Sequence, residues 1–591
     1  MDVQMPSESL SAFNDESFAL GLVNHDAHID PYPIQTDTTL IGGDPGAQFY
    51  LNADERAGVT VAGKPSYTID QAANQIVRGE PGWSAALGVG ATVTYAYRAS
   101  APASMPDDSG GFARFNSAQI NEAELALKAW SDVANIHFVR VGSGNSGEGA
   151  YSDSATILFG DYTTGVDGAA AFTMFPGNPA SGSSSGDVWV NSTLSYNINP
   201  TVGNYGGQVL VHELGHAIGL DHPSDYNADG DTVITYAANA SYYEDSRQYT
   251  VMSYFSETNT GGNDGGIYSA APLLDDIAAA QLEYGPNMST RTGDTIYGFH
   301  STAGTPWYSL TSSASRAVFA VWDAGGNDTL DFSGYANTQT IDLRQGDFSS
   351  VGGLTGDVAI AKGADIENAI GGSGSDSITG NALDNVLQGG AGADTVMAGD
   401  GNDTIQGGEG TSYLRGENGN DSITGGSAFD DINGNMGNDT LHGGDGDDWV
   451  VGGKDDDVQF GDAGNDVVWG NLGNDTLDGG DGNDQVRGGQ GDDTLTGGNG
   501  DDFISGDRGN DTESGGAGAD IFHTSQDAGI DKVLDFHLSE GDRVMLDPGT
   551  TYTVSQVGAD TVIDFGGGNE MILVGVQLST LTASPGWIFG N

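Results

Sequence analysis

The sequence predicts two unlike parts: a mixed α+β domain, followed by an all-β domain folded as a parallel β-helix, or β-roll. In the first half, apolar residues recur at helical spacing between residues 116 and 135, among short alternating segments typical of strands. From Gly371 to His523 the chain instead keeps an unbroken nine-residue register over 153 residues, or 17 units. A glycine-rich repeat of this length is typical of stacked β-helix coils.

The elements of the first half follow from local patterns. Residues 92–97, 136–141, 155–159 and 188–190 alternate or run apolar and are predicted as strands. Residues 116–135 are predicted as a helix with Ser117 as its N-cap. Further helices are expected from Tyr205 to Leu220 and from Leu273 to Tyr284.

One helix carries a cluster of metal-binding side chains. His212 and His216 are four residues apart and share a helix face, with Glu213 beside them. Gly219 can adopt the positive φ that ends a helix, so the chain can bend and bring His222 to the same ion. Three neutral histidines leave a fourth position for water, which is the arrangement of a catalytic zinc ion.

This arrangement predicts metal-assisted hydrolysis of peptide bonds. Zinc lowers the pKa of water to roughly 7 and polarises a carbonyl group. Glu213 is too close to the ligands to be ignored, and its expected role is general base toward the water and then proton donor to the leaving amine. A bare His-Glu-x-x-His pattern occurs by chance on many helices, but the extension to Gly219 and His222 makes chance a poor explanation.

A second motif follows the histidines. Val251–Phe255 contains Met252 and Tyr254, and Pro223 directly follows the third histidine. Together with the extended zinc motif, these residues resemble the serralysin subfamily of metzincin zinc metalloproteases. The resemblance implies a metzincin-type catalytic domain in which Met252 packs beneath the metal site. It also implies that Tyr254 can ligate zinc at rest and then stabilise the oxyanion.

The resemblance further implies a strand that binds substrate. In the family an edge strand pairs with extended substrate by β-augmentation. The small-residue segment at Ala169, Ala170 and Ala171 is the matching position in this chain. We therefore expect flexible or unfolded proteins as substrates, because such a cleft reads the backbone more than the side chains.

The nine-residue units predict calcium binding. In a unit such as Gly479–Arg487, the glycines expose backbone carbonyl oxygens, Asp484 supplies a carboxylate, and Val486 points inward. The sixth position is Asp in 15 of the 17 units; Asn385 and Ser412 are the exceptions. Two units make one coil, which gives about 8 coils and roughly 40 Å of stack. The predicted calcium ligands are Asp376, Asp394, Asp403, Asp421, Asp430, Asp439, Asp448, Asp466, Asp475, Asp484, Asp493, Asp502 and Asp511.

Calcium is also expected to stabilise the repeats. One apolar residue in nine buries little surface, so this domain should be largely unfolded without the ion. The departures at Asn385, at Ser412 and around Lys454 are expected to weaken some of the sites. Because the chain has no cysteine, calcium would take the place of disulfides in an extracellular protein.

Composition excludes several classes of partner. The net charge is −65, from 83 acidic and 18 basic residues, so no basic patch is expected for nucleic acid or for an anionic membrane surface. No segment reaches the ~18 consecutive apolar residues of a membrane helix, so membrane insertion is not expected. We expect a monomer that acts on protein or peptide substrates.

The termini suggest a route of export. Residues 1–20 are acidic and lack the basic and apolar parts of a signal peptide. Residues 578–591 are apolar and uncharged, and calcium-dependent repeats with such an end resemble substrates of bacterial type I secretion. The last two residues, Gly590 and Asn591, depart from the acidic-then-apolar ending common in that family. The protein is therefore expected to be secreted and extracellular.

The expected organisation is as follows: a propeptide or flexible extension at 1–62, a zinc metalloprotease domain at 63–290, a β-rich lead-in at 291–370, the calcium-binding β-roll at 371–523, and a β-rich cap with a secretion signal at 524–591.

Two other functions remain open from the sequence. The solenoid could be the working part of a calcium-dependent surface-layer or matrix protein, with the protease domain inactive or used only for self-processing. Ser184, in Gly182–Gly186, matches the letters of an esterase nucleophile elbow, but it lies in a flexible loop before a strand, whereas the elbow follows a strand and opens a helix.

Overall fold

The computed structural model describes residues 50–79, 82–105, 109–165, 169–177, 179–180, 183–226, 233–584 and 586–590. These residues belong to one compact unit that spans residues 48–591. Residues 1–49, which make up most of the predicted N-terminal extension, lie outside the described residues.

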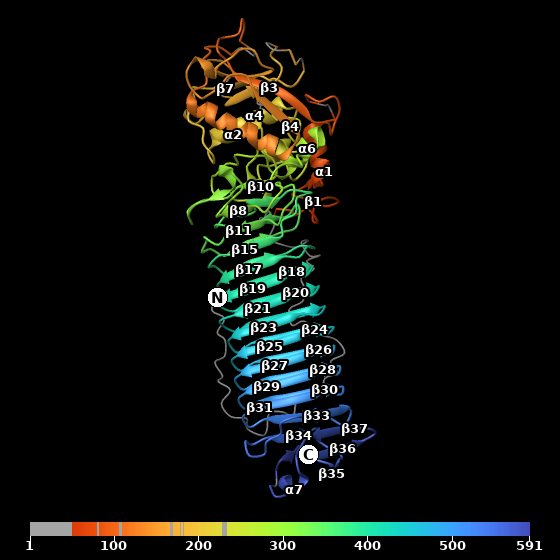
Figure 1. Ribbon diagram of the computed structural model, residues 1–591. Coiled ribbons are helices and arrows are strands. Elements are labelled where there is room, and N and C mark those ends of the chain that lie inside the picture. Colours follow the sequence, from red (N-terminus) through yellow and green to blue (C-terminus); the bar gives the residue numbers. More distant parts are fainter. Residues whose placement is uncertain are drawn as a thin grey trace. The chain divides into compact units, whose positions relative to one another are not determined.

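The N-terminal domain is built on a five-stranded sheet in the order β4-β3-β5-β7-β6. Figure 1 labels β3, β4 and β7 of this sheet. Strands β4, β3, β5 and β7 are parallel, and β6 runs antiparallel to β7 at the edge of the described sheet. The strands of this sheet are β3 (Ala91–Tyr97), β4 (Ile136–Arg140), β5 (Ile157–Tyr162), β6 (Ala171–Thr173) and β7 (Val188–Asn191), and a short hairpin of β1 (Thr60–Val61) and β2 (Lys64–Pro65) precedes them.

Three of the larger helices have clear start signals. Helix α1 (Ile69–Val77) begins after Thr68, and α2 (Ser117–Val133) begins after Asn116, each with a capping box. The prediction of Ser117 as the N-cap of α2 is wrong. The Asn116 side chain accepts hydrogen bonds from two backbone N–H groups of the first turn. The Gln119 side chain in turn accepts a hydrogen bond from the Asn116 N–H. Helix α4 (Tyr205–Ala217) is capped by Asn204.

Helix α4 ends where the sequence allows a sharp bend. Gly219 has a φ of 107°, which confirms the positive φ expected there. The helix itself ends at Ala217, three residues before the predicted end at Leu220. The other α-helices described in this domain are α3 (Ser195–Ile198), α5 (Tyr236–Asn239) and α6 (Leu274–Tyr284).

Helices α2 and α4 are held together by apolar packing and one buried hydrogen bond. Trp130 of α2 is fully buried, and its Nε1 donates to the carbonyl oxygen of Val211 in α4 at 3.0 Å. Leu127 and Leu214 are buried in the same core. Burial of a side chain of this size contributes about 1.5–3 kcal/mol, so this packing fixes the position of the helix that carries the histidines.

The C-terminal part forms two stacked sheets, which Figure 1 shows as a ladder of parallel strands. Strands in register are 18 residues apart, as in the pairing of Val468 with Val486 and of Val486 with Ile504, so each coil contains two nine-residue units. The inward apolar residues Val468, Val486 and Ile504 are fully buried.

One solenoid sheet contains β8 (Ile296–Phe299), β9 (Ser309–Leu310), β11 (Thr329–Asp331), β15 (Asn368–Ile370), β17 (Val386–Ala391), β19 (Thr404–Glu409), β21 (Ser422–Gly426), β23 (Thr440–Asp445), β25 (Val458–Ala463), β27 (Thr476–Asp481), β29 (Thr494–Asn499), β31 (Thr512–Ala517), β33 (Ile530–Val533), β35 (Thr553–Val557), β36 (Asp560–Gly566) and β37 (Asn569–Leu573).

The other contains β12 (Thr340–Asp342), β16 (Ser377–Thr379), β18 (Asp394–Asp400), β20 (Ser412–Asn418), β22 (Asp430–Met436), β24 (Trp449–Lys454), β26 (Val467–Leu472), β28 (Gln485–Gln490), β30 (Phe503–Arg508), β32 (Ile521–Thr524), β34 (Arg543–Leu546) and β38 (Ile588–Phe589).

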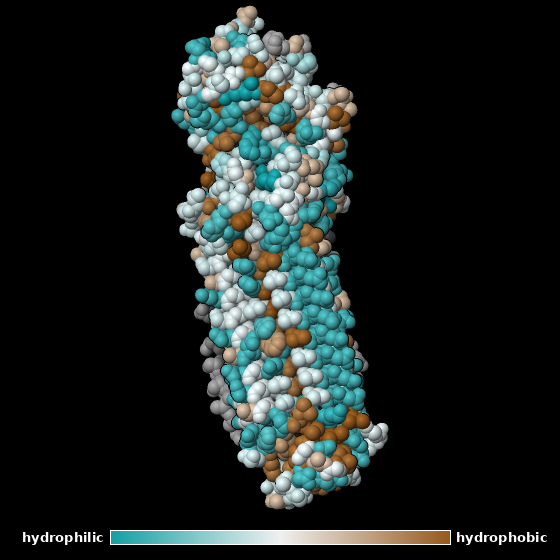
Figure 2. Space-filling model, in the orientation of Figure 1, coloured by the Kyte–Doolittle hydropathy of each residue, from teal (hydrophilic) through white to brown (hydrophobic). Residues whose placement is uncertain are grey.

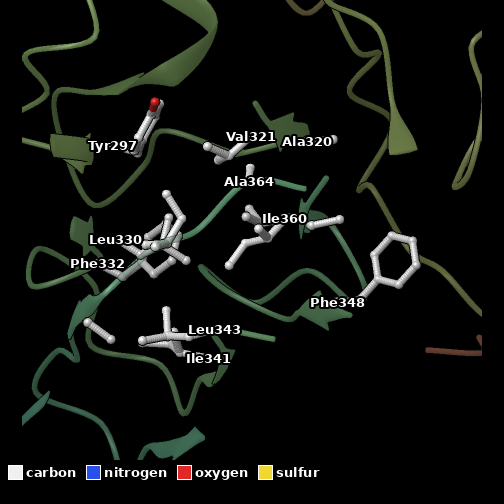
Figure 3. Packing of buried hydrophobic residues seen from close by; sticks show 14 of the residues in the cluster. Tyr297, Ala320, Val321, Leu330, Phe332, Ile341, Leu343, Phe348, Ile360 and Ala364 are labelled. Carbon is white, nitrogen blue, oxygen red and sulfur yellow. The ribbon is translucent and has the colours of Figure 1, made fainter. Parts of the chain in front are cut away.

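The solenoid begins before the repeats do. Strands β8, β11 and β15, from the lead-in at 291–370, pair in parallel within the same sheet as β17 and its successors. A small sheet of β10 (Phe319–Val321), β13 (Phe348–Ser349) and β14 (Val358–Ile360) adjoins these first coils. Figure 3 shows their shared apolar core, where Leu330, Ile341 and Ile360 pack together.

Residues 50–62 are part of the folded unit, although the sequence placed them in the extension. Leu51 is buried, and its backbone N–H donates to the Tyr249 hydroxyl at 2.7 Å. Arg56 is buried and forms a two-pronged ion pair with Asp275, each hydrogen bond 2.9 Å long. A guanidinium without its own partner would be costly to bury, so this pair ties the segment to helix α6.

Two inward positions of the solenoid hold polar side chains. Gln459 and Glu513 are fully buried at positions where the other units of the repeat carry apolar residues. Both amide atoms of Gln459 lack hydrogen-bond partners among the described residues. The outer face of the solenoid in Figure 2 carries a broad hydrophilic band, consistent with the acidic composition. Among the described residues, no helix is both long and apolar enough to cross a membrane.

Candidate active site

Three histidine rings converge at the end of helix α4. His216 Nε2 lies 3.1 Å from His222 Nε2, which in turn lies 3.4 Å from His212 Nε2. These three residues form the one group of metal-capable side chains found among the described residues. The helix supplies two of them on one face, and the bend at Gly219 returns the third, as the sequence predicted.

The outer nitrogen of each ring is engaged by the backbone. Nδ1 of His212 lies 2.8 Å from the Val251 carbonyl oxygen, and Nδ1 of His216 lies 2.7 Å from that of Leu220. Nδ1 of His222 lies 2.9 Å from the Tyr226 carbonyl oxygen. Because a carbonyl only accepts, each Nδ1 carries the proton and each Nε2 keeps a lone pair for a metal ion.

Burial also keeps these rings neutral. It lowers the pKa of His212 to about 4, with the Arg247 charge acting in the same direction. Burial, assisted by the neighbouring rings of His212 and His222, holds the pKa of His216 well below its usual range. Neutral imidazole is the form that ligates zinc, so the residues present fit that ion at neutral pH.

Glu213 lies between the histidines and the edge strand. Its side chain is buried, and Oε2 accepts a 2.6 Å hydrogen bond from Thr173 Oγ1 in β6. Burial raises the pKa of Glu213 to about 7, and the bond from Thr173 opposes that shift. A carboxyl group with a pKa near neutrality can both accept and return a proton. Thr173 was not singled out from the sequence, because its contact joins residues 40 positions apart.

Met252 supports the helix from below. It is fully buried, and a Cβ atom at Gly215 would overlap its Sδ, so the methionine packs directly on the glycine between the two helical histidines. The residue before it, Val251, holds the His212 ring through its carbonyl oxygen. The segment after the helix thus fixes both the backbone and one ring of the site.

Tyr254 stands over the histidine cluster. Its ring centroid lies 4.5 Å from that of His222 and 5.9 Å from that of His212. The side chain is 37% exposed, in contrast to the buried Met252, so it borders the cleft and not the core.

The expected substrate strand is partly a strand. Ala171 belongs to β6 and pairs with Val190, whereas Ala169 and Ala170 precede the strand. The carbonyl oxygens of Ala169 and Ala170 already accept bonds from Asn191 and Asn197 side chains. All three alanines line a cavity of about 290 Å³ that also borders the histidine cluster.

The solenoid offers a repeated set of oxygen atoms. Asp484 Oδ1 accepts a hydrogen bond from the Asp466 N–H of the preceding coil at 2.8 Å, while its buried Oδ2 has no partner among the described residues. A Cβ atom at Gly479 would lie 2.6 Å from that Oδ2 and 2.5 Å from the Gly497 carbonyl oxygen. Carboxylate and carbonyl oxygens around a glycine are the ligands that calcium prefers.

The same orphaned Oδ2 recurs along the stack. It is present in Asp394, Asp403, Asp421, Asp430, Asp439, Asp448, Asp457, Asp466, Asp475, Asp484, Asp493, Asp502, Asp511 and Asp520.

The pKa values of these carboxyl groups are raised by burial, a shift that a bound cation would oppose. Burial, reinforced by neighbouring carboxylates, raises the pKa of Asp457 and Asp511 to about 8. A divalent cation reverses such a shift, because it stabilises the ionised form.

Three positions differ from the rest. Both oxygens of Asp376 accept hydrogen bonds, from Gln339 and Gly372, so its carboxylate is already satisfied. Asn385 and Ser412 carry no charge there, as the sequence indicated. Conversely, Asp457 and Asp520 share the orphaned geometry although they were not among the predicted ligands.

Both halves of the chain match models of known protein families. Residues 286–412 match the family model described as "Peptidase M10 serralysin C terminal", and residues 113–243 match the model "Matrixin". The model "RTX calcium-binding nonapeptide repeat (4 copies)" matches residues 397–432, 424–459, 460–486, 478–513, 487–522 and 496–530.

Individual relatives point to the same family. "Metalloprotease AprA" of Pseudomonas entomophila (strain L48) is 47% identical over 342 residues, which cover 56% of this chain and 68% of the relative. "Serralysin C" of Dickeya chrysanthemi is 49% identical over 331 residues, covering 55% and 67%, and "Metallopeptidase AprA" of Pseudomonas marginalis is 47% identical over 342 residues, covering 57% and 70%. The chain therefore belongs to the serralysin family of zinc metalloendopeptidases with calcium-binding repeats.

Proposed function

We propose that the chain is a secreted endopeptidase whose zinc ion is held by His212, His216 and His222. The observation that carries this is the convergence of three Nε2 atoms within 3.4 Å of a neighbour, each ring with its Nδ1 bound to a carbonyl oxygen. When bound, zinc supplies Lewis acidity to the scissile carbonyl and to the attacking water.

Glu213 is the proposed general base. It takes a proton from the attacking water and then returns it to the amine that leaves, which requires one carboxyl group that changes state near neutral pH. The hydrogen bond from Thr173 fixes the direction of its carboxylate toward the cleft. Tyr254, which borders the cleft, is proposed to donate a hydrogen bond to the oxyanion.

The outer edge of β6, which pairs with no further strand among the described residues, is the proposed binding site for the substrate backbone. Extended peptide would add a strand there, and Ala171 is the residue of the predicted trio that lies in this strand. Ala169 and Ala170 would line the cleft next to it without offering their carbonyl oxygens, which are already hydrogen-bonded.

Calcium is proposed to stabilise the solenoid. Each orphaned Asp oxygen would otherwise be a desolvated negative charge without a partner, which costs several kcal/mol for an isolated buried ion. Asp457 and Asp520 are proposed to join the predicted ligands, and Asp376 to contribute less because it is already hydrogen-bonded.

The remaining organisation is also proposed. The chain would be a monomer exported by type I secretion with a signal near the C-terminus. The inhibitory or flexible extension would end before Tyr50, because residues 50–62 pack into the folded unit. The catalytic domain would then reach residue 290, followed by the lead-in at 291–370, the β-roll at 371–523 and the cap at 524–591.

Cleavage of casein in millimolar calcium, with and without 1,10-phenanthroline, tests this function. The chelator removes zinc and spares calcium, so activity should disappear with it and return when zinc is added. If there is no cleavage in any condition, even after residues 1–49 are removed, the chain would be better explained as a calcium-dependent surface or matrix protein.

A further inference from the structure

The cavity beside the histidine cluster has a distinctive polar lining. It has a volume of about 290 Å³, and its walls include the proposed ligand His212 and the proposed base Glu213. A substrate side chain adjacent to the cleaved bond would therefore enter it. The lining also includes Arg247 and Gln208, neither of which has a part in the proposed chemistry.

Arg247 gives the lining of this cavity a positive charge. Within the part of the chain that the structure describes, its guanidinium has no carboxylate within 4.0 Å, and its buried Nε has no hydrogen-bond partner. The Cζ atom lies 5.5 Å from the centre of the Tyr268 ring, which steadies the group without neutralising it. In a chain with 83 acidic and 18 basic residues, such an arginine is unusual.

Other arginines of the same domain are paired with carboxylates. Arg56 binds Asp275, Arg78 binds Asp221, Arg98 binds Asp187, Arg114 binds Glu148 and Arg140 binds Glu124.

Asp264 is a carboxyl group that interacts electrostatically with Arg247. Burial, with Glu257 acting in the same direction, raises the pKa of Asp264 to about 8 despite the opposing effect of Arg247. Asp264 is therefore mainly protonated near neutral pH, and it leaves the guanidinium charge available to a ligand.

Gln208 adds a second unsatisfied group. It lies four residues before His212 on α4, hence on the same helix face. The side chain is 4% exposed, and its buried Oε1 has no hydrogen-bond partner among the described residues. Because its amide can present either Oε1 or Nε2 to the cavity, Gln208 can accept from or donate to a polar ligand there.

Two tyrosines complete the same wall. Tyr196 and Tyr205 have ring centroids 5.2 Å apart and line the cavity. Burial raises the pKa of both hydroxyl groups, so they remain protonated and able to donate. The negative group in the cavity is Glu213, which is bound to Thr173 at the edge strand.

We propose that this cavity selects an acidic substrate side chain, Glu or Asp, at a position next to the cleaved bond. The proposal rests on the function proposed above. A carboxylate matches the fork of Arg247, whereas an apolar side chain leaves the guanidinium desolvated and unpaired. A flip of the Gln208 amide, which exchanges Oε1 with Nε2, lets Nε2 donate to the same carboxylate. A site built to hydrogen-bond its ligand discriminates strongly against an analogue that lacks the group.

Fluorogenic peptides that differ only in the residue on one or the other side of the cleaved bond test the proposal. With Glu, Gln, Leu and Lys compared on each side, the wild-type enzyme should cleave the Glu peptide of one series about tenfold or more faster than the Leu peptide in kcat/KM, since bonds to charged groups are strong. Arg247→Glu should reverse the order in favour of Lys, and Arg247→Gln should abolish it.

The control is Arg114→Gln. Arg114 is half-exposed and paired with Glu148 away from the cavity lining, so its loss should leave the order of the four peptides unchanged. Circular dichroism would establish that each variant is folded. A second measurement needs no variant: mass spectrometry of casein fragments from the wild-type enzyme should show acidic residues enriched on the same side of the cleaved bonds.

The outcomes separate the two proposals. Cleavage of all four peptides with similar kcat/KM, or an unchanged order in folded Arg247→Glu, would overturn the acidic selection and leave the protease function intact. Failure of the wild-type enzyme to cleave any peptide or casein with zinc present would instead overturn the function itself.

Discussion

Replacing Thr173 by Val should weaken catalysis without unfolding the protein. Val keeps the shape of the side chain but removes the 2.6 Å hydrogen bond to Glu213 Oε2. Bonds to charged groups contribute about 1.5–3 kcal/mol, and the lower value applies here because water in the cleft can replace part of the bond. A loss of about 1.4 kcal/mol corresponds to a tenfold decrease in kcat/KM.

The pH profile supplies a second readout. The hydroxyl stabilises the ionised carboxylate and therefore lowers the pKa of Glu213. Its removal raises that pKa, and because a general base acts only when deprotonated, the acid limb of kcat/KM should move to higher pH. Peptide hydrolysis across pH 5–9 would measure both effects.

Thr173→Ser is the matched control. It keeps the hydroxyl on the same edge strand and should retain most of the activity and the wild-type acid limb. If Thr173→Val were as active as Thr173→Ser at every pH, the bond to Glu213 would have no role in positioning the base.

Three further predictions concern stability. Gly215→Ala places a Cβ atom against Met252 Sδ and should lower the free energy of unfolding by about 1–3 kcal/mol, measured as a lower Tm. Asp484→Asn removes the charge of an orphaned carboxylate and should raise the calcium concentration at half-folding, whereas Asp376→Asn should shift it less because that group is already hydrogen-bonded. Gln459→Leu should raise the Tm, with a gain of about 1–3 kcal/mol, because it replaces an unsatisfied buried amide.

Each of these has its own control and contrary result. Gly149→Ala has open space around the new Cβ atom, so it should be neutral; equal effects at Gly215 would refute the packing argument. Equal calcium midpoints for the two Asp variants would show that the orphaned oxygen does not bind the ion. Gln459 lies in register between Leu441 and Leu477, so Leu should suit the site. A lower Tm for Gln459→Leu would contradict this and mean that the amide has a hydrogen-bond partner.

Local patterns in the sequence predicted much of this architecture. The spacing of His212, His216 and His222 predicts that their rings converge, because the helix period and one bend at a glycine are enough to bring them together. The repeats likewise predict their own partners 18 residues away, since each coil repeats the last. The predicted N-cap of α2 was one residue too late, because Asn116 and Ser117 are both polar and either could cap the helix. Only the reciprocal hydrogen bonds between Asn116 and Gln119 select Asn116.

Long-range contacts were beyond such patterns. Thr173 contacts Glu213, and Arg247 and Gln208 come to line one cavity, only after the sheet and the helix have packed. No local spacing signals these pairs. Asp376 has an ordinary repeat position, but its carboxylate is satisfied by hydrogen bonds from Gln339, in the preceding coil, and from Gly372. The structure therefore adds chiefly the long-range contacts that line the cleft and the hydrogen bonds at the first coil of the repeats.

The most direct test of the account is to measure zinc content and casein cleavage together, in the wild-type protein and in Glu213→Ala. The account predicts one zinc ion per chain in both proteins, with cleavage only in the wild type, since the three histidines hold the ion and Glu213 moves the proton. Cleavage by Glu213→Ala at the wild-type rate, or an active wild-type protein without zinc, would contradict it.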